Sequence, residues 1–499
     1  MKRSIALFMC LLMLLAVAVG CANNGDDNPA DTTTPHADTT PGTPDSNNPD
    51  IPSDGQYDEN GYLKDCIDPE TDLKNSDVTF LYWEDAENVE FFVNEQTGES
   101  VNDSIYSRNL TIEDRLKVKL NFVPSPGKYE KQDEFVAKAN ADITSGLCEY
   151  DVVAAYSMVI ATMAYKGMVR DLTQYSTLDF EKPWWPDNLL DESTINDKLY
   201  FASGDISTNM LYMMYCCFFN KEMLATYGLE NPYDLVDNNQ WTLDKMIEMS
   251  QNIYNDDGNN TVDNGDTFAF TLSSTVHLDP FYYGAGLRTM DKNADGQVVV
   301  SADINSEKAV NLVNKVRSYL NEGNFAFYDK TIFVEDRSLF RYDRVQIASK
   351  DLKDVSFEFG IVPVPKYDSA QENYSTILGF PYTLYGISKG SKNDENAAVT
   401  LECMASEGYR QVTPVLFEEG MKVKYAHDNK TAQMYDILRE TLSFDIGRIF
   451  TMTFQKITFQ KFRDALAEGA TDYSTLMKSQ IKLLDRLVGK FNDNFDNID

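Results

Sequence analysis

An oxygen-rich stretch from Asn255 to Asp266 has the residue types and spacing of a calcium-binding loop. With Asn255 as position one, positions 3, 5, 9 and 12 are Asp257, Asn259, Asp263 and Asp266. Calcium prefers loop-borne oxygen ligands in arrays of this kind. The alternative is an acidic surface turn, since Asn255 stands where an aspartate is usual. A structural Ca²⁺ is therefore one of two interpretations of this loop.

Residues that commonly perform catalysis do not form a recognisable pattern. The chain has three histidines: His36 precedes the predicted folded part, and His277 and His427 have no clear partner. The sequence contains no HExxH, GxSxG or phosphate-binding glycine loop. Among 79 acidic residues a pair of glycosidase carboxylates stays open, because their separation cannot be read from sequence. The sequence therefore favours a binding protein that requires no cofactor.

The N-terminus has the features of a secretion signal. Lys2 and Arg3 precede an apolar run that ends in Ala18-Val19-Gly20-Cys21. This ending resembles a bacterial lipobox, so we expect residues 1–20 to be a signal peptide and Cys21 to be lipidated. The alternative is an ordinary cleaved signal with Cys21 as a bystander. Residues 21–75 are rich in Asn, Asp, Thr and Pro in their first part and predict a disordered tether.

Length and charge limit the class of protein further. The chain has 499 residues, which exceeds what a single core usually supports, so two lobes are expected. Its formal net charge is −35, and no basic stripe is present, which argues against nucleic acid as a partner. Excluding Cys10 and Cys21, five cysteines remain without zinc-type spacing. We expect a monomer attached to the membrane only through its lipid.

Strands and helices alternate in the first part of the chain. Alternation of this kind predicts βαβ units in a parallel sheet, with ligand sites beyond the carboxyl ends of the strands. A second α/β region follows, in which Thr242 caps a helix and Asp295-Gly296 predicts a hairpin turn. The expected strands are 78–83, 118–123, 150–156, 198–203, 211–219, 358–364 and 384–387, and the expected helices are 102–116, 129–145, 221–227, 245–253, 309–320 and 395–405.

The order of several short passages resembles the bacterial extracellular solute-binding protein family, in particular the sugar-type receptors of ABC importers. Each passage is weakly specific alone, but together they span almost all of the chain after the tether. The passages are Tyr150-Asp151-Val152-Val153, Gly167-Met168-Val169-Arg170-Asp171-Leu172, Lys198-Leu199-Tyr200-Phe201-Ala202-Ser203-Gly204-Asp205, Phe219-Asn220-Lys221-Glu222-Met223-Leu224, Trp241-Thr242-Leu243-Asp244 and Gly360-Ile361-Val362-Pro363-Val364-Pro365.

The resemblance implies an α/β, periplasmic-binding-protein-like fold with two lobes, a hinge and an interlobe cleft. We expect residues 76–207 and 383–440 to form lobe 1, and residues 208–382 and 441–499 to form lobe 2. The hinge crossings are expected near 205–209, near 379–382 and between 442 and 451. A ligand would then lie between the lobes.

Aromatic residues on loops, together with carboxylates, are the candidate ligand-binding residues. Sugars stack their C–H faces on aromatic rings and direct their hydroxyls to carboxylates and amides. For every aromatic candidate the alternative is ordinary packing in the core, and for Asp205 it is a turn or a helix cap. The candidates are Trp83, Glu84, Asp85, Tyr156, Asp205, Phe281, Tyr282, Tyr283, Phe380 and Tyr382.

The resemblance implies a receptor that binds a ligand, expected to be a carbohydrate, and delivers it to the permease subunits of an ABC importer. Closure of the two lobes around the ligand would produce the form that the permease recognises. Two alternatives stay open at this point: a surface-anchored glycoside hydrolase, and a glycan-capturing surface protein without a transporter. The sequence does not identify the ligand.

Overall fold

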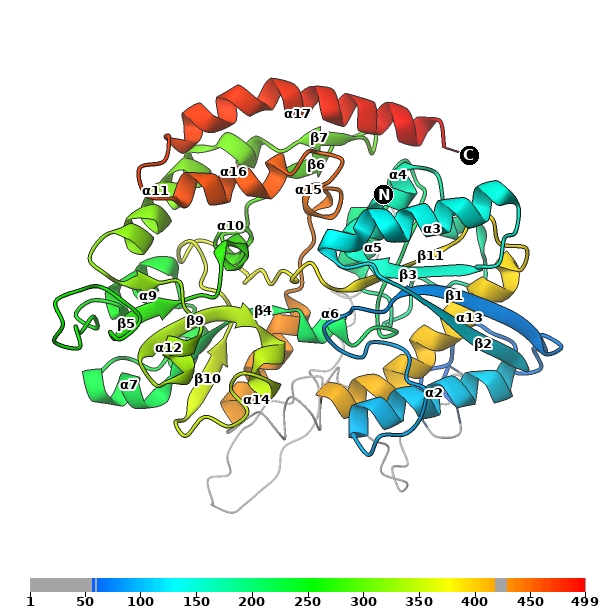
Figure 1. The fold of residues 1–499 in the computed structure, drawn as a ribbon, viewed down its shortest axis with the longest axis horizontal. Coiled ribbons are helices and arrows are strands. Elements are labelled where there is room, and N and C mark those ends of the chain that lie inside the picture. Colours follow the sequence, from blue (N-terminus) through cyan, green and yellow to red (C-terminus); the bar gives the residue numbers. More distant parts are fainter. Residues whose placement is uncertain (1–55, 59–60, 418–428, 499) are drawn as a thin grey trace, which may run out of the picture. The chain divides into compact units, whose positions relative to one another are not determined.

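The computed structural model describes residues 56–58, 61–417 and 429–498, which form an α/β fold with two main sheets (Figure 1). Residues 1–55, 59–60, 418–428 and 499 lie outside the described part, so the predicted signal peptide and Cys21 are not among the described residues. We call the four-stranded sheet with its helices the first lobe, and the five-stranded sheet with its helices the second lobe.

The first lobe contains the parallel strands that the sequence predicts. Its sheet has the order β11-β3-β1-β2, in which β1 is parallel to β2 and β3, and β11 is antiparallel to β3. Helices α2 and α13 cover one face of the sheet, and α3 and α4 cover the other (Figure 1). The elements are β1 (Ser76–Trp83), α2 (Ser100–Leu116), β2 (Val118–Ser125), α3 (Gln132–Ser145), β3 (Val152–Tyr156), α4 (Ser157–Tyr165), α5 (Asp187–Ser193), β11 (Thr383–Ile387) and α13 (Asp394–Glu407).

Strand β3 is buried along its whole length, as expected for an internal strand with helices on both faces. Strand β1 ends at Trp83, beside Ser125 of β2, and β3 ends at Tyr156. Because these strands are parallel, their carboxyl ends meet at one edge of the sheet. That edge therefore brings Trp83 and Tyr156 together.

The second lobe is built on a mixed sheet of order β10-β4-β9-β5-β8, in which β9, β5 and β8 are parallel and β4 is antiparallel to both β10 and β9. Its strands are β4 (Tyr215–Asn220), β5 (Phe268–Thr271), β8 (Ala326–Phe327), β9 (Ser338–Arg344) and β10 (Phe359–Val362). The helices of this part are α6 (Asn209–Tyr212), α7 (Lys221–Tyr227), α8 (Pro232–Asp237), α9 (Leu243–Met249), α10 (Asp279–Gly284), α11 (Glu307–Asn321), α12 (Thr331–Val334) and α14 (Asn429–Glu440).

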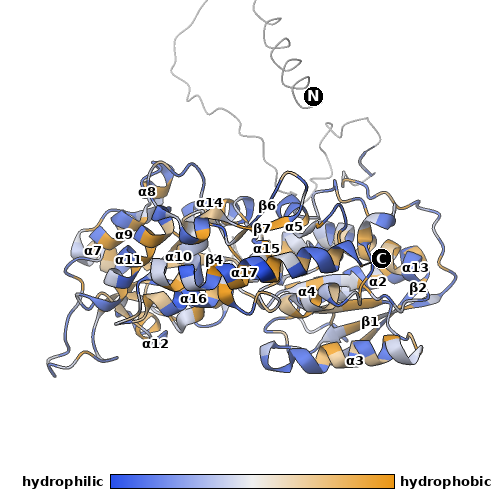
Figure 2. Cartoon of the chain, turned by 90° about the horizontal axis from the view of Figure 1, so that it is seen from above, coloured by the Kyte–Doolittle hydropathy of each residue, from blue (hydrophilic) through white to orange (hydrophobic). Residues whose placement is uncertain are grey.

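The C-terminal helices continue this second part. The hairpin of β6 (Met290–Lys292) and β7 (Val298–Val300) turns at Asp295-Gly296, which confirms the predicted hairpin, and it contacts the last helix. Helices α15 (Ile446–Ile449), α16 (Ile457–Leu466) and α17 (Tyr473–Asp496) complete the chain. Hydrophilic and hydrophobic residues alternate along α17 in Figure 2, as expected for an amphipathic helix with one buried face.

Three chain segments run side by side where the chain passes between the two sheets. Tyr215 donates its backbone N–H to the carbonyl oxygen of Ile377, at 2.9 Å between nitrogen and oxygen, and Gly379 donates to Met213 at 2.7 Å. Ser443 in turn donates to Thr376 at 2.8 Å. The second and third predicted crossings therefore contain hydrogen-bonded segments, whereas the first such segment lies at 213–215, after the predicted 205–209.

Some predicted elements differ from the structure. Residues 198–203 do not form a strand and make two isolated bridges, between Lys198 and Ile195 and between Ala202 and Tyr385. The apolar run 211–219 was predicted as one strand, but its start belongs to α6 and only the part from Tyr215 is β4. An apolar run that is buried on all sides has no period that separates helix from strand, which explains this error.

The predicted tether ends too late in the sequence. Residues 61–75 pack on the first lobe: Ile67 is buried, and Asp65 accepts hydrogen bonds from Arg115 at 2.6 and 2.7 Å. Although burial opposes ionisation, Arg115 and Arg410 lower the pKa of Asp65 to about 2. These ion pairs fix a segment that composition alone assigns to disorder.

The predicted boundary of lobe 1 at residue 440 also differs from the structure. Helix α14 packs on β10 of the second sheet, and Thr431 on this helix forms a hydrogen bond of 2.6 Å with the Tyr233 hydroxyl. The segment from Asn429 to Glu440 therefore packs with the second lobe.

Candidate functional site

A cavity of about 570 Å³ lies at the carboxyl end of β1 and is lined by this strand, the loop after it and Asn102 on α2. Its wall includes the predicted residues Trp83 and Glu84. Half-buried aromatic rings of Tyr82 and Phe92 lie next to amide and carboxylate side chains in the same wall, with 5.8 Å between the two ring centroids. The cavity thus combines flat apolar surfaces with hydrogen-bonding groups.

The indole of Trp83 is held in place by a chain of hydrogen bonds. Its Nε1 donates to the Thr383 hydroxyl at 2.7 Å, and that hydroxyl donates to the Glu90 carboxylate, also at 2.7 Å. The Trp83 ring meets the Tyr156 ring edge to face, with 5.3 Å between centroids. Trp83 is only 2% exposed, so a small part of its surface reaches the cavity.

Glu90 is a buried carboxylate to which two chain segments donate. Its Oε2 accepts hydrogen bonds from the Ser207 hydroxyl, which lies just before the first crossing, and from the backbone N–H of Thr383, just after the second. Burial raises the pKa of Glu90 to about 7, although these hydrogen bonds oppose the rise. The same carboxyl group therefore connects the position of Trp83 to the chain segments between the lobes.

Tyr156 lies where charged groups of both lobes approach. Burial raises the pKa of its phenol, and Arg448, Glu87, Tyr129 and Arg344 all act on this group electrostatically. Tyr156 is 6% exposed. Its ring lies at the carboxyl end of β3, against the ring of Trp83.

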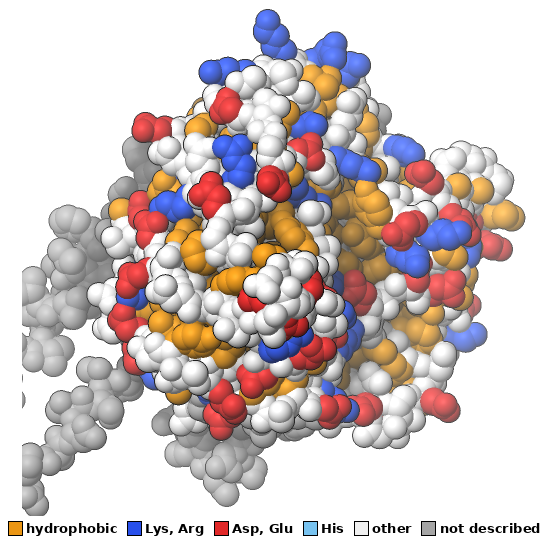
Figure 3. Space-filling model, turned by 60° about the vertical axis from the view of Figure 1, so that its left-hand side comes forward, with side chains coloured by type: hydrophobic (Ala, Val, Ile, Leu, Met, Phe, Trp, Pro, Cys, Tyr) orange, Lys and Arg blue, Asp and Glu red, His pale blue; other side chains and the backbone are white. Residues whose placement is uncertain are grey.

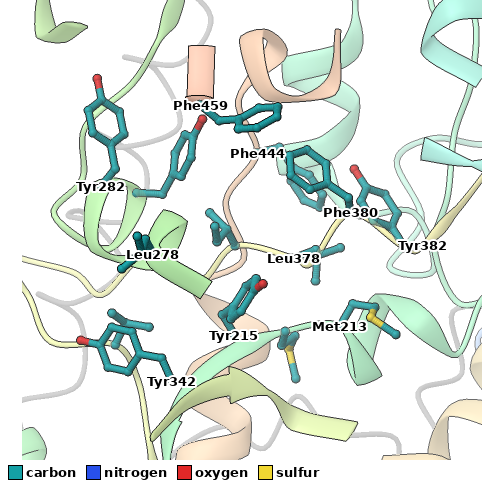
Figure 4. Packing of buried hydrophobic residues seen from close by; sticks show 14 of the residues in the cluster. Met213, Tyr215, Leu278, Tyr282, Tyr342, Leu378, Phe380, Tyr382, Phe444 and Phe459 are labelled. Atoms are coloured by element: carbon teal, nitrogen blue, oxygen red, sulfur yellow. The ribbon is translucent and has the colours of Figure 1, made fainter. Parts of the chain in front are cut away.

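Phe380 and Tyr382 follow the second crossing and surround a small pocket of about 20 Å³ with Phe444 and Arg448. The Arg448 guanidinium stacks on the Phe380 ring at 3.6 Å from its centroid. The rings of Phe380, Tyr382 and Phe444 lie together in Figure 4, near Phe459. In the space-filling view of Figure 3, hydrophobic side chains line a hollow that charged side chains border.

Arg448 is held by a buried ion-pair cluster. Asp279 accepts hydrogen bonds from Arg448 and, at 2.7 Å, from both Nε and Nη2 of Arg463. Although burial opposes ionisation, the two arginines keep the pKa of Asp279 below its usual range. The cluster fixes the guanidinium that stacks on Phe380 and joins α10, α15 and α16.

The predicted aromatic trio Phe281, Tyr282 and Tyr283 lies on α10 and is buried. Phe281 packs on Tyr342 with 4.7 Å between ring centroids, and the Tyr282 hydroxyl donates to the Arg288 carbonyl oxygen at 3.1 Å. Only Tyr283 contacts the Arg448 guanidinium, at 5.5 Å from its ring centroid. Packing contacts explain why Phe281 and Tyr282 are buried. A ligand-binding role for the three residues stays a prediction.

The two predicted aspartates make structural contacts. Asp85 accepts hydrogen bonds from the backbone N–H groups of Gly127 and Lys128, each at 2.9 Å, and so joins the loops after β1 and β2. Asp205 accepts from the Thr413 hydroxyl at 2.6 Å and lines a different cavity of about 260 Å³, beside Arg439. Burial raises the pKa of Asp205. The structure therefore does not bring Asp205 to the cavity beside Trp83.

The predicted calcium loop is folded around Asp266. This carboxylate accepts hydrogen bonds from the backbone N–H groups of Asp257 at 3.0 Å and Asp263 at 3.2 Å. Carboxylate oxygens of Asp256, Asp257 and Asp266 all lie within 4.8 Å of one another, whereas Asn259 donates to Asp263. Asn255 contributes a backbone bridge to Thr267. Calcium binding by this loop stays a prediction, with Asp256 added to the possible ligands.

Three residues that sequence reasoning missed lie at the junction of the lobes. Arg344 ends β9, Arg448 lies on α15 inside the third predicted crossing, and Glu87 lies in the loop after β1. A Cβ atom on Gly379 would come within 2.7 Å of Arg344 Cδ, so the glycine at this crossing leaves room for the arginine. Only Arg448 had a signal in the sequence, namely its place in a predicted crossing.

The arrangement of two α/β lobes joined by three crossing segments defines the class of two-lobed solute-binding proteins. Residues 113–411, more than half of the chain, match the family described as bacterial extracellular solute-binding protein. The chain belongs to this family. Its members bind their substrates without acting on them as enzymes.

Several solved structures have the same fold. A substrate-binding protein of Listeria monocytogenes in complex with cycloalternan is 14% identical, with a TM-score of 0.53, and the match covers 83% of this chain and 99% of that one. A cyclic α-maltosyl-1,6-maltose binding protein of Arthrobacter globiformis is 16% identical, with a TM-score of 0.58 and the same coverage. A Mycobacterium tuberculosis protein in complex with glycerophosphocholine is 15% identical, with a TM-score of 0.53, and the match covers 82% of this chain and 98% of that one.

These identities are low, so the matches establish the fold and not the ligand. No curated protein sequence matches the chain. Among the residues that the structure describes, no helix has both the length and the apolar composition needed to cross a membrane.

Proposed function

We propose that this protein is the membrane-anchored extracellular receptor of an ABC importer and that it binds a carbohydrate between its lobes. The observation that carries the proposal is the cavity wall at the end of β1, where the rings of Tyr82, Trp83 and Phe92 adjoin carboxylate and amide groups. Sugars offer both an apolar face and hydroxyl groups, and a wall of this kind matches both. The saccharides bound by two of the proteins with the same fold agree with this ligand class.

Closure of the lobes would provide the signal to the permease. The crossing segments at 213–215, 376–379 and 441–443 are short and hydrogen-bonded to one another, which suits a hinge. A ligand that contacts both lobes stabilises the closed form in proportion to its preference for that form. Trp83 and Tyr156 would contribute from the first lobe, and Phe380 from the second crossing.

Anchoring follows from the sequence of the N-terminus. Lipidation of Cys21 would keep the receptor beside the permease, and the segment between Cys21 and the packed residues from 61 onward would give it reach. Metabolic labelling with a palmitate analogue tests this part: wild type should be labelled and Cys21→Ser should not.

Binding without turnover is the test of the proposed function. The Cys21→Ser protein is titrated with maltotetraose, cyclic tetrasaccharide, tagatose and glycerophosphocholine in a calorimeter, and each mixture is then analysed for products. We expect saturable binding of a saccharide at one site per chain with no products. Release of smaller saccharides would instead support the hydrolase interpretation. Selective binding of glycerophosphocholine would show that the ligand is not a carbohydrate.

A further inference from the structure

Glu87 lies in the loop after β1, in the first lobe, and its carboxylate accepts hydrogen bonds from two residues of the second lobe. Arg344 Nη1 donates to both carboxylate oxygens at 2.9 Å, and Gln346 Nε2 donates to Oε2 at 2.7 Å. Both donors belong to the end of β9 and the 3₁₀ helix that follows it. The interaction therefore joins the two lobes directly.

The backbone of Glu87 and the side chain of Asn88 add hydrogen bonds to the same contact. Lys350 Nζ donates to the Glu87 carbonyl oxygen at 3.0 Å, and Asn88 Nδ2 donates to Gln346 Oε1 at 2.9 Å. Lys350 also donates to Gln346 Oε1 at 2.9 Å. Two consecutive residues of one lobe are thus bonded to three residues of the other, and these five residues form what we call the interlobe clamp.

The charges in the clamp favour the paired arrangement. Although burial opposes ionisation, Arg344, Gln346 and Lys350 keep the pKa of Glu87 below its usual range. The side chain of Arg344 is 18% exposed and that of Glu87 is 39% exposed, so the pair is partly shielded from water. Charge-assisted hydrogen bonds in such a setting are stronger than those of a fully exposed pair.

We propose that Glu87 is a positioning residue that holds the two lobes together through Arg344, Gln346 and Lys350 and thereby raises the affinity for the ligand. Contacts that exist only when the lobes meet shift the balance between open and closed forms. The apparent affinity of a ligand for the closed form changes in proportion to the closed fraction. The effect on affinity rests on the proposed function, whereas the effect on how the lobes are held together does not need a ligand.

A distance measurement on the ligand-free protein tests the first part. One nitroxide is attached to Cys148 in the first lobe and another to Tyr328→Cys in the second, where Tyr328 is 46% exposed. Cys66 and Cys21 are replaced by serine, and electron–electron double resonance reports the distance distribution. Glu87→Ala and Arg344→Ala should each lengthen or broaden the distribution, and the double variant should resemble either single variant.

Glu99→Ala is the matched control, because Glu99 is an exposed acid in the same loop that lies outside the clamp. Its distribution should equal that of the parent protein. Since exposed charges are screened by salt, 1 M NaCl should move the parent toward Glu87→Ala and leave that variant unchanged. Identical distributions for the parent, Glu87→Ala and Arg344→Ala would overturn the proposal, as would an equal change in Glu99→Ala.

Titration with the saccharide that binds the parent protein tests the second part. Glu87→Ala should weaken binding by about threefold to tenfold, and the effects of Glu87→Ala and Arg344→Ala should not add. Equal affinity in Glu87→Ala and the parent would refute the role in binding. Failure of every saccharide to bind would count against the proposed function, while the distance measurement would still decide whether the clamp holds the lobes.

Discussion

Replacement of Glu90 by glutamine should stabilise the protein at alkaline pH and leave it nearly unchanged at acidic pH. Burial raises the pKa of this carboxyl group from 4.5 to about 7 in the folded protein. One pKa unit corresponds to about 1.4 kcal/mol, so ionisation of Glu90 costs the folded state about 3 kcal/mol. Glutamine has nearly the same shape, carries no charge, and has a carbonyl oxygen that accepts and an amide group that donates hydrogen bonds.

The sign of the pH dependence follows from proton binding. Between pH 4.5 and about 7 the folded state holds a proton on Glu90 that the unfolded state has lost, so the free energy of unfolding falls as pH rises. Below pH 4.5 Glu90 is protonated in both states, and the stability that its raised pKa provides is fully present. Above about pH 7 that contribution is lost.

Urea unfolding at several pH values measures this effect. The free energy of unfolding of Glu90→Gln minus that of wild type should rise by about 3 kcal/mol between pH 4.5 and pH 8. Glu95→Gln, an exposed residue of the same loop, is the control and should show no such rise. A constant difference between Glu90→Gln and wild type across this range would refute the assignment of a buried, mostly protonated carboxyl group.

Three further predictions concern other parts of the chain. Asp279→Asn should lower the free energy of unfolding by about 3 kcal/mol, because Arg448 and Arg463 lose a buried partner. The surface substitution Asp464→Asn should lower it by less than about 0.5 kcal/mol, and urea unfolding compares the two variants. Calcium should raise the melting temperature of wild type and of Asp295→Asn but not of Asp257→Asn, and an equal rise in all three would place any calcium site elsewhere. Trp83→Phe should weaken saccharide binding, and binding should quench the tryptophan fluorescence of this variant less than that of wild type. Unchanged affinity would remove Trp83 from the site.

Periodicity and strand order predicted the first lobe well. The strands at 78–83, 118–123 and 150–156 correspond to β1, β2 and β3, since β-branched and aromatic residues alternate or run continuously in them. The parallel arrangement followed from the helices between them. The meeting of Trp83 and Tyr156 at one edge was accessible from these facts alone.

The second lobe was harder to predict because its strands are short and buried. Strand β9 contains Arg341, Asp343 and Arg344, which are charged residues that no strand pattern anticipates. Arg341 and Asp343 are buried as an ion pair at 2.6 Å, so the charges satisfy one another inside the lobe. Such pairing depends on tertiary structure and leaves no periodic signal in the sequence.

The contacts between lobes were also beyond sequence reasoning. Glu87 and Arg344 are separated by more than 250 positions in the chain, and neither belongs to a motif. Glu90 looks like any acidic loop residue until Ser207 and Thr383 are seen to donate to it. Asp205 shows the converse, because its position after a predicted strand suggested the ligand cavity while its actual partners are Thr413 and Arg439.

The most direct test of the central claim is a calorimetric titration of the Cys21→Ser protein with a saccharide series, followed by X-ray scattering with and without the saccharide that binds. The account predicts binding at one site per chain, a smaller radius of gyration when the ligand is bound, and an unchanged saccharide afterwards. Absence of binding across the series, or conversion of the saccharide to products, would contradict it.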